Sequence, residues 1–319
     1  MKYIDFHCDT LLMYRPGANS EGLYQNQHSV DFVRMQQGEC AAQFFATFMP
    51  PRTRMPESED EPFRQALYDG LMNEIAAHSD MIAFARSYEE YIANQSKGLM
   101  SAFLTFEDGR MVDGSHEKLE TYYQLGYRLI SFTWNSANCF GFPNSSDAEE
   151  MKKGLTPFGF EAVEHMNQLG MIIDVSHLSD GGFYDVAKTT KKPFVASHSN
   201  ARSLTPHQRN LTDDMLRLLG EKGGMTGINF APEFIGESVT STESTVTRIC
   251  DHIEHIADVA GIEAVGLGSD WDGIGGRLEV ASPLDVHKIF EELQRRGFSQ
   301  TNIEKFAYGN AERILKEVL

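Results

Sequence analysis

Six polar side chains that can bind metals stand at or just after the ends of short apolar runs. Imidazole nitrogens and carboxylate oxygens are ligands that zinc takes in catalytic sites, and manganese or cobalt can substitute for it. If the fold brings such groups together, they can hold metals that activate water for hydrolysis. The six residues are His7, Asp9, Glu107, His177, His198 and Asp270.

The spacing of these residues is informative. His7 and Asp9 flank Cys8, and the two-residue period of a strand turns both side chains to the same face. His177 and His198 each follow an apolar run and a serine, and their separation is that of one βα unit. The first pair can therefore reach one metal, and the second pair lies on successive strands.

Each motif also has a purely structural interpretation. A His-x-Asp triplet can form a hydrogen bond at a strand end, and Glu107 can belong to a solvated turn that Gly109 makes sharp. A single histidine after a strand is often structural. Asp272 precedes Gly273 in a common turn pair, so we interpret it as a turn residue.

Eight runs rich in β-branched or aromatic residues alternate with segments of helical periodicity. This alternation predicts parallel strands joined by crossover helices, and the nearly continuous apolar character suits strands buried on both faces. We expect one α/β domain over residues 1–319, a (β/α)8 TIM barrel, although the alternation alone also permits a doubly wound open sheet. The runs are Tyr3 to His7, Ala41 to Phe48, Leu99 to Phe106, Leu129 to Thr133, Met171 to Val175, Phe194 to Ser197, Met225 to Phe230 and Ala264 to Leu267.

Helix signals support this organisation. Thr156 and Pro157 predict the start of a helix that Gly170 ends. Its expected apolar stripe is Phe160, Val163, Met166 and Leu169. The segment from Thr212 to Gly220 repeats the pattern, and two segments predict inserted loops, Met49 to Glu61 and Asn135 to Gly154.

The charge of the chain limits its partners. It contains 28 Lys and Arg against 46 Asp and Glu, and this formal net charge of −18 repels phosphate backbones and anionic membranes. We therefore expect no nucleic-acid partner and no membrane association. The same charge can favour neutral or cationic substrates, or it can belong only to a solvated surface.

Location and redox state follow from similar signals. We see no signal peptide at the N-terminus and no apolar run approaching the roughly 18 residues of a membrane span, so we expect a cytoplasmic protein. The four cysteines are far apart and include no Cys-x-x-Cys pair, so we expect them to be reduced. They are Cys8, Cys40, Cys139 and Cys250.

The six candidate ligands support a metal site more strongly together than each does alone. In a (β/α)8 barrel the carboxyl ends of all strands meet at one mouth, and each of the six stands at such an end. Three imidazoles and three carboxylates in one pocket would be hard to accommodate without cations. The sequence therefore predicts a site for two divalent metal ions, with zinc as the expected ion.

Six segments that carry these residues resemble the membrane (renal) dipeptidase family, peptidase family M19, of the amidohydrolase superfamily. The resemblance covers most of the chain, and the order and spacing of the motifs are specific. The segments are Asp5-Phe6-His7-Cys8-Asp9, Phe106-Glu107-Asp108-Gly109, Ile173-Asp174-Val175-Ser176-His177, Ala196-Ser197-His198-Ser199, Arg209-Asn210-Leu211-Thr212-Asp213 and Gly268-Ser269-Asp270-Trp271-Asp272-Gly273.

The resemblance implies a dinuclear metallo-dipeptidase and a role for each residue. His7 and Asp9 would bind one zinc, His177 and His198 the other, and Glu107 would bridge them. Asp270 would exchange a proton with the metal-bound hydroxide that attacks the peptide bond, and Arg209 would bind the substrate carboxylate. The family often forms homodimers and accepts dipeptides whose second residue has the D configuration, so both are expectations here.

This sequence departs from the family in one respect that concerns the substrate. Many members carry a substrate-binding histidine after the fourth strand, whereas this chain has Trp134 followed by Asn135. We therefore name Trp134 and Asn135 as candidate substrate-binding residues without assigning an oxyanion donor. The secretory and lipid-anchor signals of animal members are not evident either, which agrees with the expected cytoplasmic location.

Two other hypotheses remain at this point. Another amidohydrolase-type hydrolase could act on lactones, cyclic amides or amino groups, but such enzymes commonly use a carbamylated lysine or one metal, and here Glu107 takes the bridging position. A barrel that binds ligands without catalysis would be favoured by the loss of a metal ligand, and the set is complete.

Overall fold

Eight parallel strands form a closed barrel in the computed structural model, which describes residues 1–319. The strands are β1 (Tyr3–Cys8), β2 (Cys40–Phe48), β4 (Met100–Glu107), β5 (Tyr127–Ser131), β6 (Ile172–Asp174), β7 (Val195–Ala196), β8 (Met225–Ile228) and β10 (Val265–Leu267). The barrel is closed because β1 pairs with both β2 and β10, while β2 also pairs with β4. The predicted (β/α)8 fold is therefore confirmed, and the alternative prediction of a doubly wound open sheet is wrong.

Three short strands lie outside this ring and were not predicted. β3 (Ile82–Phe84) pairs with the first residues of β4, before the segment of β4 that pairs with β5. β9 (Glu243–Ser244) and β11 (Arg277–Leu278) form a separate parallel pair. β9 and β11 contain charged residues and lie in no apolar run, and the three residues of β3 are too few to show a period, so no pattern indicated these strands.

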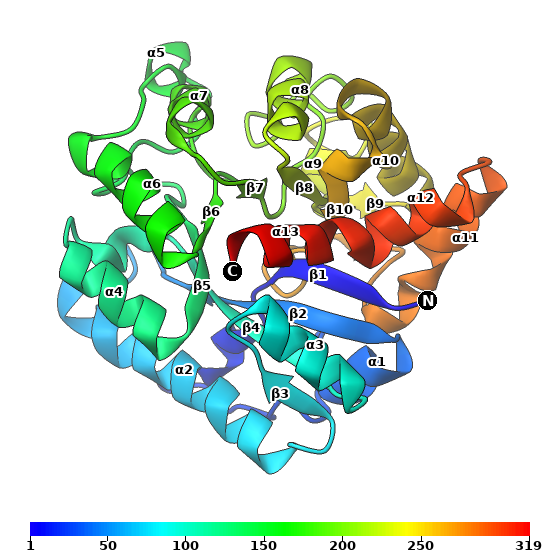
Figure 1. The fold of residues 1–319 in the computed structure, drawn as a ribbon, viewed down its shortest axis with the longest axis horizontal. Helices are drawn as coiled ribbons and strands as arrows, with labels where there is room; N and C mark the ends of the chain where they lie inside the picture. Colours follow the sequence, from blue (N-terminus) through cyan, green and yellow to red (C-terminus); the bar gives the residue numbers. More distant parts are fainter.

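The helices surround the barrel, and α13 lies across the strands at its centre in Figure 1. None of them is apolar over a stretch long enough to cross a membrane. Their bounds are α1 (Phe32–Gln37), α2 (Asp60–Ala77), α3 (Tyr88–Ser96), α4 (His116–Leu125), α5 (Ala148–Met151), α6 (Pro157–Leu169), α7 (Asp180–Thr189), α8 (Asp213–Glu221), α9 (Pro232–Ile235), α10 (Val246–Ala260), α11 (His287–Arg295), α12 (Gln300–Glu304) and α13 (Asn310–Val318).

Helix α6 begins and ends as expected, but its predicted stripe was wrong at one position. The Thr156 side chain accepts a hydrogen bond from the Gly159 N–H (3.0 Å), and Gly170 ends the helix at φ 78°. Phe160, however, is 37% exposed. Steps of three residues drift around a helix with 3.6 residues per turn, so Phe160 falls outside the buried face that Val163 and Met166 occupy.

Two other expected segments differ slightly from the structure. Helix α8 is capped by Thr212 as predicted but continues through Gly220 to Glu221. The two predicted loops each contain helical residues, because α2 begins at Asp60 and α5 lies within the second loop.

Apolar side chains fill the barrel below the site. A cluster of 16 buried residues takes members from seven barrel strands, including Phe6, Phe44 and Phe103, which stack on one another. Four residues of α13 join this cluster, so α13 covers the amino-terminal end of the barrel. The opposite end, where the strands finish, is left for polar side chains.

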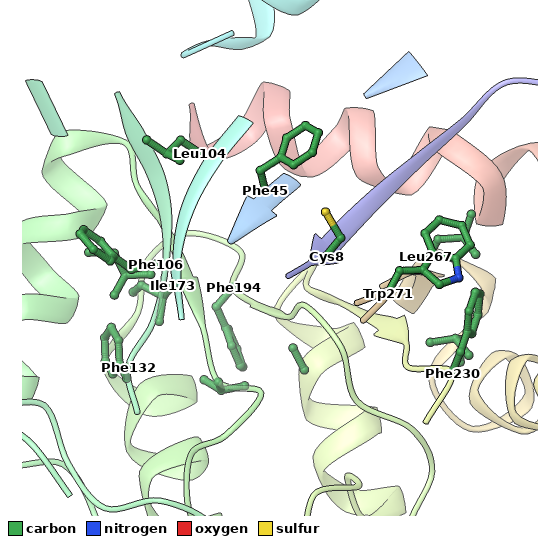
Figure 2. Packing of buried hydrophobic residues seen from close by; sticks show 14 of the residues in the cluster. Cys8, Phe45, Leu104, Phe106, Phe132, Ile173, Phe194, Phe230, Leu267 and Trp271 are labelled. Carbon is green, nitrogen blue, oxygen red and sulfur yellow. The ribbon is translucent and has the colours of Figure 1, made fainter. Parts of the chain in front are cut away.

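A larger apolar cluster determines which side chains face away from the site. Cys8 and Phe106 are buried in it, and both appear among the packed side chains in Figure 2. Because neighbours along a strand point to opposite faces, burial of Cys8 turns His7 the other way, and burial of Phe106 does the same for Glu107.

Candidate active site

All six candidate ligands meet at the carboxyl ends of the barrel strands, and all six are buried. His7 belongs to β1 and Glu107 is the last residue of β4. The other four lie on the loops that follow β1, β6, β7 and β10. Residues that are far apart in the sequence thus lie together in one pocket, as the sequence predicted.

Glu107 lies close to all three histidines of the site. Its Oε2 atom lies 3.4 Å from His7 Nε2, whereas its Oε1 atom lies 2.8 Å from His177 Nε2 and 3.6 Å from His198 Nε2. The Nε2 atoms of His177 and His198 are 3.0 Å apart, so they converge on one point. The nearest histidine to Oε2 is therefore His7 and the nearest to Oε1 is His177, while the rings of His7 and His198 also lie close, with centroids 3.9 Å apart.

Two further carboxylates approach His7 from the other side. His7 Nε2 lies 3.8 Å from Asp9 Oδ2 and 3.7 Å from Asp270 Oδ1. The second oxygen of Asp270 accepts a hydrogen bond from the Asn229 side chain at 2.8 Å. Asp270 has a positive φ of 62°, a conformation that is uncommon outside glycine and is often found at functional sites.

The donor atoms left without partners suit metal binding. His7 Nε2, Asp9 Oδ1 and Glu107 Oε2 are buried and form no hydrogen bond. Burying a polar group without a partner costs roughly 2–7 kcal/mol, so such atoms call for a ligand. Two sets have ligand atoms within 4.8 Å of one another, His7 with Glu107 and His198, and His7 with Asp9 and Asp270. His7 belongs to both sets.

The protonation of these groups reflects burial and crowding. Burial and the nearby charge of Asp9 raise the pKa of Glu107 to about 8, and burial raises that of Asp270 to about 7. Burial lowers the pKa values of His177 and His198 well below the usual histidine range. For His7, burial acts in the same direction, but Glu107 and Asp9 outweigh it and raise the pKa.

Asp5 supports the site from beneath and was missed in the sequence. It accepts hydrogen bonds from the backbone N–H (2.8 Å) and the hydroxyl (2.7 Å) of Ser269, the residue before Asp270. Gln43 donates a third bond at 2.8 Å. A charged residue within the apolar run Tyr3 to His7 was the available signal, because a buried carboxylate needs partners.

A cavity of about 740 Å³ opens above the carboxylates and histidines. Arg209 lines it and is itself buried, with Nη1 donating to the carbonyl of Ser176 and to Ser199 Oγ, and Nη2 to the carbonyl of His198. The Nε–H of Arg209 has no partner. Burial lowers the Arg209 pKa to about 10, so the guanidinium stays cationic at neutral pH and keeps a donor free.

The remaining predicted residues line or border this cavity. Trp134 packs edge-on against Phe48 (5.0 Å between ring centroids) and forms part of the wall. Asn135 also lines it, with Oδ1 3.4 Å from His177 Nδ1. Asp272 has the positive φ of a tight turn (68°), and it accepts hydrogen bonds from Thr10 and from the backbone of the loop before α1.

Gly273 allows the close approach of two site carboxylates, and we expect Gly273→Ala to impair the site. A Cβ atom there would lie 2.1 Å from Asp9 Oδ2 and 2.7 Å from Asp270 Oδ1. A displacement of about 1 Å in a catalytic group can cost about 100-fold in rate, so kcat/KM should fall by about that factor. Gly275→Ala is the matched control, since a Cβ atom there meets nothing within 4 Å. Equal activity of the two variants would contradict this prediction.

Closed parallel barrels with histidines and carboxylates at the strand ends are typical of metal-dependent hydrolases. The convergence of Glu107 with its histidines, beneath a cavity that a small substrate can enter, places this chain among the metal-dependent hydrolases built on a (β/α)8 barrel.

Comparison with known proteins identifies the family. The profile of the membrane dipeptidase family, peptidase family M19, matches residues 1–319, and the chain belongs to this family. An uncharacterized dipeptidase of Schizosaccharomyces pombe is 36% identical over 300 residues, which cover 90% of this chain and 71% of that protein.

Two solved structures are similar over their whole length. One is a metallopeptidase of family M19, dipeptidase AC, at 29% identity and a TM-score of 0.90, covering 100% of this chain and 98% of the other. The second is a metallopeptidase of Rhodobacter sphaeroides bound to a phosphinate mimic of the dipeptide L-Ala-D-Ala, at 26% identity and a TM-score of 0.91, covering 100% and 99%. The family predicted from the motifs is thereby confirmed.

Proposed function

We propose that this protein is a zinc-dependent dipeptidase that hydrolyses the peptide bond of dipeptides, including those with a D residue in second place. The observation that carries the proposal is the position of Glu107 at the floor of the cavity, where its Oε2 atom faces His7 and its Oε1 atom faces His177. The complex of the Rhodobacter sphaeroides relative with a dipeptide mimic supports the choice of substrate.

Five side chains would hold the two metals. His7 and Asp9 would bind one, His177 and His198 the other, and Glu107 both. When bound, such a pair lowers the pKa of a water molecule and polarises the carbonyl that the water attacks. The low pKa values of His177 and His198 suit this role, because a histidine must be neutral to ligate.

Asp270 and Arg209 would act on the substrate. Asp270 would take the proton of the attacking water and pass it to the leaving amine, and a pKa of about 7 matches that task near neutral pH. Asn229 holds the other oxygen of Asp270 in place. Arg209 would bind the free carboxylate of the second residue, which restricts the enzyme to very short peptides.

A panel of L,L and L,D dipeptides, assayed with added zinc, manganese or cobalt, tests the proposal together with metal analysis of the purified protein. We expect hydrolysis of some members and a content approaching two metals per chain. A protein that binds no metal and cleaves no member of the panel would refute it.

A different amidohydrolase reaction is less well supported. No lysine lines the cavity, so no carbamylated lysine could bridge two metals there. The cytoplasmic location and the homodimer stay predictions, which cell fractionation and the mass of the protein in solution would test.

Arg209→Lys should reduce the preference for a free carboxylate. A lysine ammonium cannot reproduce a planar two-point contact, and a charge-assisted hydrogen bond contributes about 1.5–3 kcal/mol, so kcat/KM for dipeptides should fall about 10- to 100-fold. The same dipeptides as C-terminal amides should be affected much less. Arg54→Lys is the control, because Arg54 lines the same cavity and its side chain forms no ion pair or hydrogen bond. Equal losses with acids and amides would contradict the assignment.

Metal binding should release protons near neutral pH. Because the pKa of Glu107 is raised to about 8, this carboxyl holds a proton below that pH in the metal-free protein and must lose it to ligate. His7, whose pKa is also raised, must lose its proton as well, so metal affinity should rise with pH up to about 8 and the contribution of Glu107 to the proton release should vanish above that pH. Calorimetric titration of chelator-treated protein, in buffers that differ in ionisation enthalpy, measures the release. Titration heats independent of the buffer at about pH 7 would contradict the prediction.

A further inference from the structure

Asp174, at the end of β6, is a buried carboxylate beneath the histidines. Like Asp5, it is not one of the six candidate ligands. Its Oδ1 atom accepts the backbone N–H groups of Ser176 (3.0 Å) and Ser197 (2.8 Å) and the Ser176 hydroxyl (2.7 Å). Its Oδ2 atom accepts the hydroxyls of Ser131 and Ser197, the latter at 2.6 Å. Every partner of Asp174 is a donor, so this side chain acts only as an acceptor.

The bond from Ser197 determines where the proton of His198 lies. A serine hydroxyl has one proton, and that of Ser197 points to Asp174 Oδ2. Ser197 Oγ also lies 2.7 Å from His198 Nδ1 and can only accept there. His198 Nδ1 must therefore be the donor, which leaves His198 Nε2 unprotonated where it faces Glu107 Oε1 (3.6 Å) and His177 Nε2 (3.0 Å).

We propose that Asp174 is a positioning residue that holds His198 in its Nδ1–H form through Ser197. That this Nδ1–H form serves metal binding rests on the proposed function. The location of the proton on Nδ1 follows from the hydrogen bonds alone. Partners that orient a ligating histidine typically contribute about 10- to 100-fold to metal affinity. Asp174 is not in the cavity lining and forms no hydrogen bond to the six candidate ligands. Ser197 connects it to His198 Nδ1, whereas Ser176 connects it only to the His198 backbone N–H, which carries no ring proton.

The isosteric variant Asp174→Asn should reverse the direction of the hydrogen bonds that connect residue 174, Ser197 and His198. The two backbone N–H groups require an acceptor at the Oδ1 position, so the amide NH2 takes the Oδ2 position and donates to Ser197 Oγ. The Ser197 hydroxyl proton then turns to His198 Nδ1. The histidine must carry its own proton on Nε2, where it points at Glu107 and blocks that lone pair.

Nitrogen-15 NMR of histidine side chains in the chelator-treated protein reads this state directly. We expect His198 to be protonated at Nδ1 in the natural protein and at Nε2 in Asp174→Asn. With zinc added, the variant should bind the second ion about 10- to 100-fold more weakly. Assignment comes from the signal missing in His198→Gln.

Asp5→Asn is the matched control. Asp5 accepts the N–H and hydroxyl of Ser269 as Asp174 does for Ser197, but the next residue is Asp270, so no histidine proton depends on it. We expect His198 to stay protonated at Nδ1 in this variant.

Two outcomes would overturn the proposal: an Nε2–H form of His198 in the natural protein, or an unchanged Nδ1–H form in Asp174→Asn. If Asp174→Asn does not fold, Ser197→Ala replaces it, and there the Nδ1–H preference of His198 should be lost. A persistent Nδ1–H form in Ser197→Ala would likewise overturn it. Lack of dipeptidase activity in the natural protein would refute the proposed function and leave this NMR result standing.

Discussion

Glu107→Gln is expected to abolish dipeptide hydrolysis and to lower the metal content of the purified protein. The substitution keeps the shape of the side chain but removes the charge that faces His7 on one side and His177 on the other. Bound metal ions contribute several kcal/mol of transition-state stabilisation. If the variant loses its metals, its kcat/KM should therefore fall by about 1,000-fold or more. Steady-state kinetics and elemental analysis of the same preparation measure both effects.

Glu233→Gln is the control for this experiment. Glu233 lines the same cavity and forms no ion pair or hydrogen bond through its side chain, so its loss changes the charge of the cavity without touching the ligands. The control should keep its metals. A Glu107→Gln protein with full metal content and near-natural activity would show that Glu107 bridges nothing.

Asp270→Asn is expected to separate metal binding from catalysis. If Asp270 moves the proton, its amide cannot, and kcat should fall by about 100- to 10,000-fold while the metal content is retained. The distance of 3.7 Å between Asp270 and His7 would also suit a metal ligand. In that case the metal content would fall together with kcat, which would contradict the assigned role.

Asp272→Asn serves as the comparison for Asp270→Asn. This acid lies two residues further on and shares the positive φ, which asparagine tolerates. Its oxygens bind Thr10 and the Ser29 backbone instead of site residues. The expected effect on kcat is small, so a large loss in both variants would point to a general effect of charge at this loop.

The pattern of the sequence predicted the parts of this protein that depend on local order. Alternating apolar runs indicated the parallel strands, and residues such as Thr156 and Gly170 indicated where a helix begins and ends. Polar residues at the strand ends indicated the site. These signals are readable because burial of a strand and capping of a helix impose requirements on neighbouring residues.

The same reasoning missed features that depend on contacts between distant segments. β3, β9 and β11 owe their existence to partners elsewhere in the chain, and the exposure of Phe160 depends on which face of α6 meets the barrel. The hydrogen bonds of Asp5 and Asp174 likewise join one strand to the next.

The sequence by itself determined the fold class, the family and the six residues that could bind metals, because residue types and their spacing along each strand carry that information. Only the tertiary structure decided which oxygen of Glu107 faces which histidine, that Ser197 Oγ lies against His198 Nδ1, and that Gly273 leaves room for two carboxylates. These are distances across the barrel mouth, and they depend on how eight strands close into a ring.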